Sequence, residues 1–369
     1  MSEGRFLRKV MIKALVLFVA LNLLFAALNP LPALGSLSLY NHIFPGRQRL
    51  PFGENPAISY NVSLYNLNAM FKSLALDGTK KGADEYRVLV VGDSSVWGTL
   101  LHPEQTLAGQ IKAADLKVCG KTVRAYNLGY PTLSLTKDVL ILDLLQPYQP
   151  DQIVWLTTLE SFPRSKQLAS PIVANNAKTI VALIAKDHLQ LDPADAALIF
   201  PNFWQRTLIG QRRALADLLR LQYAGVMWAA TGIDQVYPTD YTPAERDLQA
   251  DATYAGWKDR IPADGLALDA LDAGFTAAGS TPVLLVNEPM LISSGKNSDI
   301  RYNFYYPRGI YDQYRQILSD RALQNGWQYL DLWNLVPQTE FTNSAIHLTP
   351  AGESLLAHQV ESALGQTCK

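Results

Sequence analysis

The apolar positions of this chain fall, from residue 86 onward, into short runs separated by segments with helical spacing. Five runs are typical of buried strands: 88–91 (VLVV), 123–128 (VRAYNL), 152–156 (QIVWL), 282–286 (PVLLV) and 327–332 (WQYLDL). Helical patterns at 104–114 and 136–145 lie between the first three runs. Short apolar strands that alternate with helices indicate a parallel sheet covered on both faces. The pattern therefore predicts a doubly wound, flavodoxin-like α/β sheet.

More than a hundred residues separate the third predicted strand from the fourth, far more than one crossover helix needs. Residues 205–223 have helical periodicity, and the apolar piece 224–233 that follows is too short to span a bilayer. We interpret residues 165–280 approximately as a helical insertion, either a cap over the sheet edge or a surface that lies on a membrane. The α/β domain then covers 85–369, and 36–84 is a linker or lead-in with a short helix around 64–76.

The N-terminal segment differs from the rest of the chain. An apolar run at 14–28, interrupted only by Asn22, follows four basic residues, which are Arg5, Arg8, Lys9 and Lys13. With residues 10–12 it is long enough for one transmembrane helix, and the basic residues predict a cytoplasmic N-terminus. An uncleaved signal anchor and a cleaved signal peptide both fit. The long run, without a clean cleavage site, favours the anchor, so we expect 1–35 to be a cytoplasmic tip and membrane anchor of a single-pass protein whose catalytic domain is extracytoplasmic.

Composition narrows the function classes. The chain has 48% hydrophobic and 18% charged residues and a net charge of -1, which suits a globular core and gives no signal for nucleic acid. No Cys/His spacing resembles a zinc site, and we expect neither a metal nor an organic cofactor. The two cysteines, Cys119 and Cys368, fit an extracytoplasmic location. A disulfide between them and two free thiols both remain open.

Candidate chemistry lies where the predicted strands end, because ligands of an open parallel sheet bind at the carboxyl ends of its strands. The polar residues that follow the first four strands are Asp93, Ser94 and Ser95; Asn127 and Gly129; Thr157 and Thr158; and Asn287 and Glu288. Serine ester chemistry needs a hydroxyl, an imidazole and oxyanion donors. Of the five histidines, only His347 directly precedes a helix start, marked by Thr349 and Pro350.

Several of these residues also have structural interpretations. We expect Asp93 to accept hydrogen bonds at a helix N-terminus, and Ser95 to be a cap or packing residue. Gly129 fits either a turn or an oxyanion donor. The tyrosine-rich stretch 301–314 fits a carbohydrate-stacking surface or, as we favour, packing under the lead-in segment.

Three motifs together resemble those of the SGNH (GDSL-type) esterase and acyltransferase superfamily. They are GDSS at 92–95, NLGY at 127–130 and HLTPAG at 347–352. The resemblance spans about 86–364, leaves the insertion unmatched, and is greatest to membrane-anchored members that modify envelope or extracellular polysaccharides. It implies that Ser94 is the nucleophile and His347 the general base. It also implies that the backbone N–H groups of Ser94 and Gly129 are oxyanion donors.

The chain departs from the family pattern at two places. The family's acid, about three residues before the histidine, is replaced here by Ser344, with Asn343 one residue earlier. A neutral acceptor such as Asn343 can still hold the imidazole tautomer. The family's third-strand asparagine is also missing, so Thr157 or Thr158 would have to supply that oxyanion donor, with Asn287 as a further candidate.

These observations predict a serine esterase or acyltransferase that acts on O-acyl groups, chiefly acetyl, of an envelope or extracellular glycan through an acyl-serine intermediate. Proteins of polysaccharide synthesis or export would be its partners. Whether water or a sugar hydroxyl receives the acyl group stays open. One alternative is a glycan-binding or scaffold component with a decayed active site, and a cytoplasmic lipase is a third interpretation.

Overall fold

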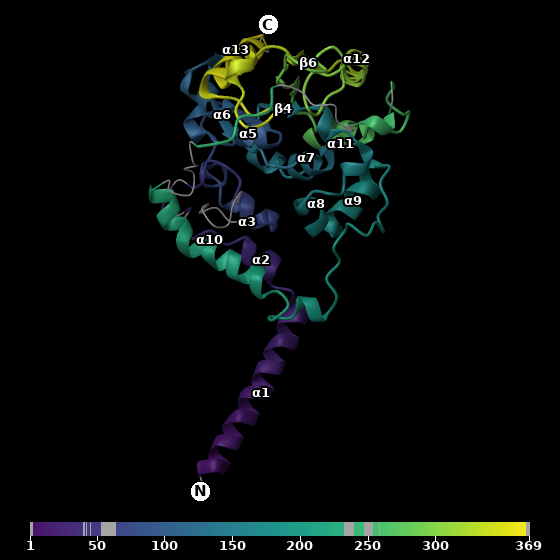
Figure 1. Ribbon diagram of the computed structural model, residues 1–369. Coiled ribbons are helices and arrows are strands. Elements are labelled where there is room, and N and C mark those ends of the chain that lie inside the picture. The colour runs from purple at the N-terminus through teal and green to yellow at the C-terminus, as the bar shows by residue number, and fades with distance from the viewer. Residues whose placement is uncertain are drawn as a thin grey trace.

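The computed structural model describes residues 3–39, 41, 43–44, 46–52, 64–231, 240–246, 254–257 and 259–366. The long helix α1 (Glu3–Leu28) extends away from an α/β body like a stem, and α13 (Pro350–Gly365) lies at the opposite end of that body (Figure 1).

The body contains one six-stranded sheet. Its strands, in spatial order, are β2 (Lys117–Val118), β3 (Lys121–Asn127), β1 (Glu85–Val91), β4 (Gln152–Thr157), β5 (Val283–Asn287) and β6 (Gln328–Asp331). All neighbours pair in parallel except β2, which is antiparallel to β3. The chain passes from β1 to β3 and then back to β4 on the other side, so β1 lies at the topological switch point. This order confirms the predicted doubly wound, flavodoxin-like sheet.

Helices cover both faces because successive side chains of a strand point to opposite sides. Leu89 and Val91 of β1 join a core with α7 (Leu135–Leu142), α11 (Leu268–Ala278) and α12 (Arg308–Asn325). Val88 and Val90 join a second core with α6 (Leu107–Ala113) and α13. The predicted helices 104–114 and 136–145 overlap with α6 and α7, whose first turns are capped by Thr106 and Ser134.

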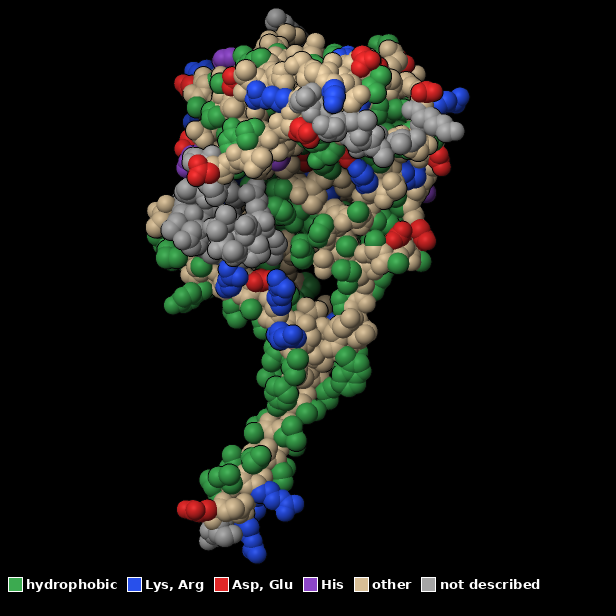
Figure 2. Space-filling view, in the orientation of Figure 1, with side chains coloured by type: hydrophobic (Ala, Val, Ile, Leu, Met, Phe, Trp, Pro, Cys, Tyr) green, Lys and Arg blue, Asp and Glu red, His purple; other side chains and the backbone are tan. Residues whose placement is uncertain are grey.

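The stem helix α1 is 26 residues long with a hydropathy of 2.4, and by length and composition it is able to cross a membrane. Most of its apolar side chains are exposed, Phe25 and Ala26 being exceptions, and basic side chains gather at its free end (Figure 2). A short helix, α2 (Leu31–Gly35), follows it. Cys119 is disulfide-bonded, and the chain's other cysteine, Cys368, lies outside the described residues.

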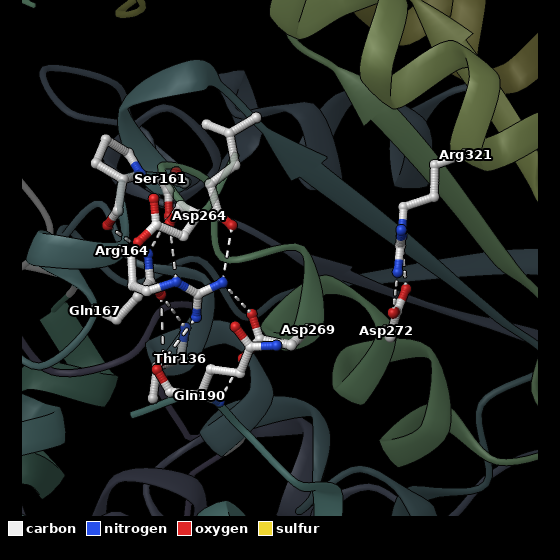
Figure 3. A network of polar contacts seen from close by, with 11 residues as sticks. Thr136, Ser161, Arg164, Gln167, Gln190, Asp264, Asp269, Asp272 and Arg321 are labelled. Atoms are coloured by element: carbon white, nitrogen blue, oxygen red, sulfur yellow. Dashed lines mark hydrogen bonds and ion pairs between the residues drawn. The ribbon is translucent and has the colours of Figure 1, made fainter. Parts of the chain in front are cut away.

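The insertion region contains α8 (Pro171–Asn175), α9 (Ala177–Asp187) and α10 (Arg212–Thr231), and α11 lies at its end. The predicted helix 205–223 thus begins later and continues through most of the apolar piece after it; residues 232–233 lie outside the described residues. Side chains at the start of the insertion contact both the body and α11 (Figure 3). Gln167 Oε1 accepts from the backbone N–H of Thr136 (3.0 Å), and Arg164 pairs with Asp269 of α11 (2.8 Å).

Part of the segment 36–84 packs against the residues that directly follow the turn after β1. The Arg49 guanidinium donates to the carbonyls of Gly98 (2.9 Å) and Leu101 (3.0 Å) and lies 4.6 Å from the centre of a Trp97 ring. Trp97 Nε1 in turn donates to Leu50 O (2.9 Å). The predicted short helix around 64–76 is formed by α3 (Leu67–Lys72), and α4 (Ala75–Gly78) follows it.

Candidate active site

Ser94 begins α5 (Ser94–Trp97), a single turn that directly follows β1. Asp93 caps this turn, because its Oδ1 accepts from the Ser95 N–H (2.8 Å), which confirms the structural role expected for Asp93. Gly92 lies so close to Val96 that a Cβ there would meet the Val96 side chain at 2.5 Å. Gly98 (φ 84°) ends the turn. The local sequence therefore holds the half-buried Ser94 at the carboxyl edge of the sheet.

His347 lies on a loop closed by its own backbone. The Thr342 N–H donates to His347 O (2.8 Å), and the Leu291 N–H, beyond β5, donates to Ala345 O (2.7 Å). As predicted, Thr349 caps α13 by accepting from the Gly352 N–H (3.2 Å), with Pro350 in the first turn. This loop is therefore tied both to the sheet edge and to a helix start.

The loop brings His347 between Asn343 and Ser94. His347 Nε2 lies 2.8 Å from Ser94 Oγ, and His347 Nδ1 lies 2.8 Å from Asn343 Oδ1. Because an amide oxygen only accepts, Nδ1 carries the proton, and the lone pair of Nε2 faces the Ser94 hydroxyl. The residue that meets Nδ1 is Asn343, four positions before the histidine, and not Ser344.

Burial lowers the pKa of His347 to about 4. Desolvation disfavours the charged imidazolium, so at neutral pH the ring is neutral and able to accept a proton. A carboxylate at the place of Asn343 would oppose this effect by stabilising the imidazolium. The neutral Asn343 amide does not offset the desolvation, so the pKa of His347 stays low.

Replacing Asn343 by aspartate tests this electrostatic account. In the wild type we expect the acid limb of kcat/KM for an aryl acetate near pH 4, where His347 becomes protonated and can no longer accept the Ser94 proton. In Asn343→Asp the new charge favours the imidazolium and should raise that limb by about one pH unit. Asn343→Leu, which has no acceptor, is the control and should lower kcat/KM without raising the limb. An unchanged limb in Asn343→Asp would contradict the contact.

The oxyanion candidates differ in what their donors contact. The Ser94 N–H is the first of α5 and has no acceptor within the helix, so it remains a candidate. The Gly129 N–H donates instead to Asn127 Oδ1 (2.9 Å). Gly129 also packs on the Val96–Trp97 backbone, where a Cβ would lie 2.3 Å from Trp97 N. Close backbone approach therefore requires a glycine here, and the oxyanion role of Gly129 stays a prediction.

The side chains of Thr158 and Asn287 form hydrogen bonds with core residues and not with Ser94 or His347. The hydroxyls of Thr158 and Tyr306 lie 2.8 Å apart in a buried contact. The buried Asn287 donates to Asp331 Oδ1 (2.8 Å) and accepts from Tyr314 OH (3.2 Å). Both side chains use their polar atoms inside the core, and the oxyanion or substrate roles of Thr158 and Asn287 stay predictions. Four tyrosines of 301–314 are buried: Tyr302, Tyr306, Tyr311 and Tyr314. Packing and not an open stacking surface accounts for them, but their hydrogen-bond contacts are with the body, such as Thr158 and Asn287, and not with the described part of the lead-in segment.

Two buried ionisable side chains, Glu288 and Lys137, form a cluster with the turn that carries Ser94. Ser95 Oγ donates to Glu288, and Lys137 Nζ donates to Gly92 O (2.7 Å). Burial raises the pKa of Glu288 well above its usual range, and the nearby Asp93 carboxyl raises it further. Sequence reasoning missed this cluster. The position of Glu288 after a strand was a signal, but nothing in the sequence pairs it with Ser95.

Among the residues that the structure describes, no group of three or more His, Cys, Asp or Glu side chains could hold a metal ion. The chemistry available at the edge of the sheet is that of a hydroxyl, a neutral imidazole and a backbone N–H. This set of groups suits nucleophilic attack by Ser94 on a carbonyl carbon.

Neither a protein family model nor a curated protein sequence matches the chain. Solved structures similar to it include a protein of the G-D-S-L family from Desulfitobacterium hafniense, at 9% identity and a TM-score of 0.32, covering 75% of this chain and 98% of that one. A carbohydrate acetylesterase family member from Sinorhizobium meliloti is 13% identical (TM-score 0.33, 75% and 96% covered). An acetyl-xylooligosaccharide esterase from Geobacillus is 12% identical (TM-score 0.34, 76% and 94% covered). GDSL-type proteins, which the motifs of this chain resemble, are thus among the solved structures to which it is similar.

Proposed function

We propose that this chain is a serine esterase or O-acyltransferase that works through an acyl-Ser94 intermediate. The observation that carries the proposal is the continuous hydrogen-bonded chain from Ser94 through His347 to Asn343, at the carboxyl edge of the sheet. A hydroxyl, a base that faces it and a third group that orients the base form the arrangement that activates a weak nucleophile.

The reaction proceeds in two halves. His347 Nε2 takes the Ser94 proton as Oγ attacks the ester carbonyl, and the Ser94 N–H stabilises the resulting oxyanion. Collapse of the tetrahedral species breaks the C–O bond, and the leaving alkoxide takes the proton from His347. Water or a sugar hydroxyl then gives its proton to His347 and attacks the acyl-Ser94 carbonyl. The second tetrahedral species collapses by breaking the C–Oγ bond, Ser94 Oγ takes the proton back from His347, and the acid or the acylated sugar leaves.

We propose O-acyl groups, chiefly acetyl, of an envelope or extracellular glycan as the substrate. The motif resemblance supports this class, and so does the architecture, in which an apolar stem precedes the body. In this proposal α1 crosses the membrane once, with Arg5, Arg8 and Lys9 on the cytoplasmic side and the body outside.

Labelling with a fluorophosphonate probe tests the proposal. Full-length protein in detergent should be labelled covalently, and Ser94→Ala should abolish the labelling because it removes the attacking oxygen. Ser344→Ala is the matched control: it removes a serine on the His347 loop and should leave labelling intact. An unlabelled wild type, or label that persists in Ser94→Ala, would overturn the acyl-serine mechanism.

The same preparation separates hydrolysis from transfer. With an aryl acetate as donor and an added oligosaccharide as acceptor, a hydrolase releases free acetate, whereas a transferase yields acetylated sugar at the expense of acetate. The ratio of the two products, measured by mass spectrometry, gives the partition of the acyl-enzyme directly.

A glycan-binding or scaffold protein with an inactive site is the second candidate. It is favoured by the neutral Asn343 in place of an acid and by the engagement of Thr158 and Asn287 inside the core. Oligosaccharide binding with neither probe labelling nor aryl acetate turnover would support this second candidate over the enzyme.

A further inference from the structure

Exposed apolar side chains gather on one part of the insertion, next to the stem helix. We call this set the collar; its members are Phe200, Phe203, Trp204, Ile209, Leu219, Tyr223 and Met227. Trp204 is 72% exposed and Tyr223 is 92% exposed. Large apolar side chains that are exposed together, and not singly, mark a contact surface.

The collar contacts α1 at Asn22, the polar residue within the apolar run 14–28. The backbone N–H of Ile209 donates to Asn22 Oδ1 (3.1 Å), while Asn22 Nδ2 donates to Phe18 O (2.9 Å). Asn22 is buried, although most of α1 is exposed. This contact explains why an otherwise apolar segment contains an asparagine at this position.

The position of Asn22 sets the depth of the collar. Asn22 lies six residues before the end of α1 at Leu28, and six residues of α-helix span about 9 Å. The residues between them, 23–28 (LLFAAL), are all apolar. If α1 crosses a bilayer, the chain around Ile209 therefore lies beside lipid-facing helix, below the level at which α1 ends.

The helix α10 carries two faces. Leu218 and Leu221 are buried against the body, whereas Leu219, Tyr223 and Met227 are exposed at helical spacing. A helix with one side on the protein and a second apolar stripe outward is typical of a membrane-surface contact.

Hydrogen bonds to the chain after α2 fix α10 close to the end of the stem. Gln222 Nε2 donates to Leu37 O (2.6 Å), and the Leu39 N–H donates to Gln222 Oε1 (2.9 Å). Together with the Asn22 contact, they hold residue 209 and the first half of α10 near the C-terminal end of α1, and α10 rises away from the stem beyond that point (Figure 1). The collar therefore cannot move away from a membrane that α1 crosses without breaking these contacts.

The charge near the collar is positive. Between 199 and 227 the chain has one acidic residue, Asp217, and four arginines, which are Arg206, Arg212, Arg213 and Arg220. Figure 2 shows Lys and Arg side chains over α10, beside apolar side chains that continue down to α1. Aromatic side chains next to arginines suit the lipid headgroup region, where the rings are half-immersed and the cations meet phosphates.

We infer that residues 199–209 and the beginning of α10 rest on the outer leaflet of the membrane that α1 crosses, with Phe203 and Trp204 in the headgroup region. This inference rests on the proposed membrane anchoring by α1. A second contact beside the stem fixes the orientation of the body, so that the Ser94 edge is held at a constant height above the bilayer.

Photocrosslinking from full-length protein in nanodiscs tests the inference. The nanodiscs contain phosphatidylglycerol and phosphatidylethanolamine, and p-benzoylphenylalanine replaces one residue at a time: Trp204, Leu323 or Leu17. Leu323 is the matched control, since it is an 83% exposed apolar residue on α12, away from the stem. Leu17, in the middle of α1, reports on the anchor itself. Irradiation should give phospholipid adducts at 17 and 204 but not at 323, detected by mass spectrometry.

The other outcomes separate the two proposals. Adducts at 17 without any at 204 would overturn the collar contact and leave the anchor intact. A crosslink from 204 to a second copy of the chain would also overturn it, in favour of a dimer surface. Absence of lipid adducts at 17 would overturn the anchor and the collar contact together.

Discussion

Replacing His347 by alanine is expected to lower kcat/KM for an aryl acetate by about 10²- to 10⁴-fold, because the Ser94 hydroxyl then loses the base that takes its proton. The 2.8 Å contact between Nε2 and Oγ is within the range for proton transfer, and the low pKa of the imidazole keeps it in the base form at neutral pH. Initial rates across pH 5 to 9 measure the effect.

The matched control is His358→Ala, which removes an exposed histidine of α13 and should leave the rate unchanged. The double variant Ser94→Ala/His347→Ala should be no slower than Ser94→Ala alone, since residues that act as a unit are not additive. A residual rate within tenfold of wild type in His347→Ala would remove His347 from the mechanism.

Replacing Glu353 by glutamine is expected to stabilise the protein at pH 8 but not at pH 4.5. Burial raises the pKa of Glu353 from 4.5 to about 8. The folded state therefore holds a proton that the unfolded state loses, so stability is full below the unfolded pKa and falls as pH rises toward the folded pKa. At about 1.4 kcal/mol per pH unit the loss approaches 5 kcal/mol at pH 8.

Glutamine cannot ionise and so avoids this loss, but its extra N–H group has no prepared partner, which costs about 1 to 2 kcal/mol. The net gain at pH 8 is then roughly 3 kcal/mol, measured by urea unfolding in detergent. Glu361→Gln on the same helix controls for removal of a carboxylate. Equal changes in the free energy of unfolding at pH 4.5 and pH 8 would contradict the burial argument.

Several features of the fold and the site depend on short stretches of chain, and these were predictable. The apolar runs form the strands because a strand buried on both faces must be apolar throughout. The Gly92-Asp93-Ser94 turn is made by its own residues, through the Asp93 cap and the close packing of Gly92. Thr349 and Pro350 start α13 in the same local way. These elements position Ser94 and His347.

The contacts of other candidate residues depend on which distant segments meet, which the sequence pattern does not show. Thr158 and Asn287 end strands at the ligand edge, as a donor would, yet Tyr306 and Tyr314 approach from elsewhere in the chain and occupy their polar atoms. Gly129 packs against the Val96–Trp97 backbone, a contact between two strand-end loops that the sequence pattern does not contain. The contact of Glu288 was likewise not predictable from local sequence, because its partner, Ser95, is 193 residues away in the chain.

By itself the sequence determined the strand and helix segments, the apolar stem and the placement of Ser94 and His347 on separate strand-end loops, since periodicity and capping act over a few residues. Only the tertiary structure decided that Asn343, not Ser344, meets His347, because the Thr342–His347 hydrogen bond sets the loop geometry. It also decided that Asn22 of the stem meets Ile209 of the insertion. Burial and partner choice are long-range properties, which no local pattern contains.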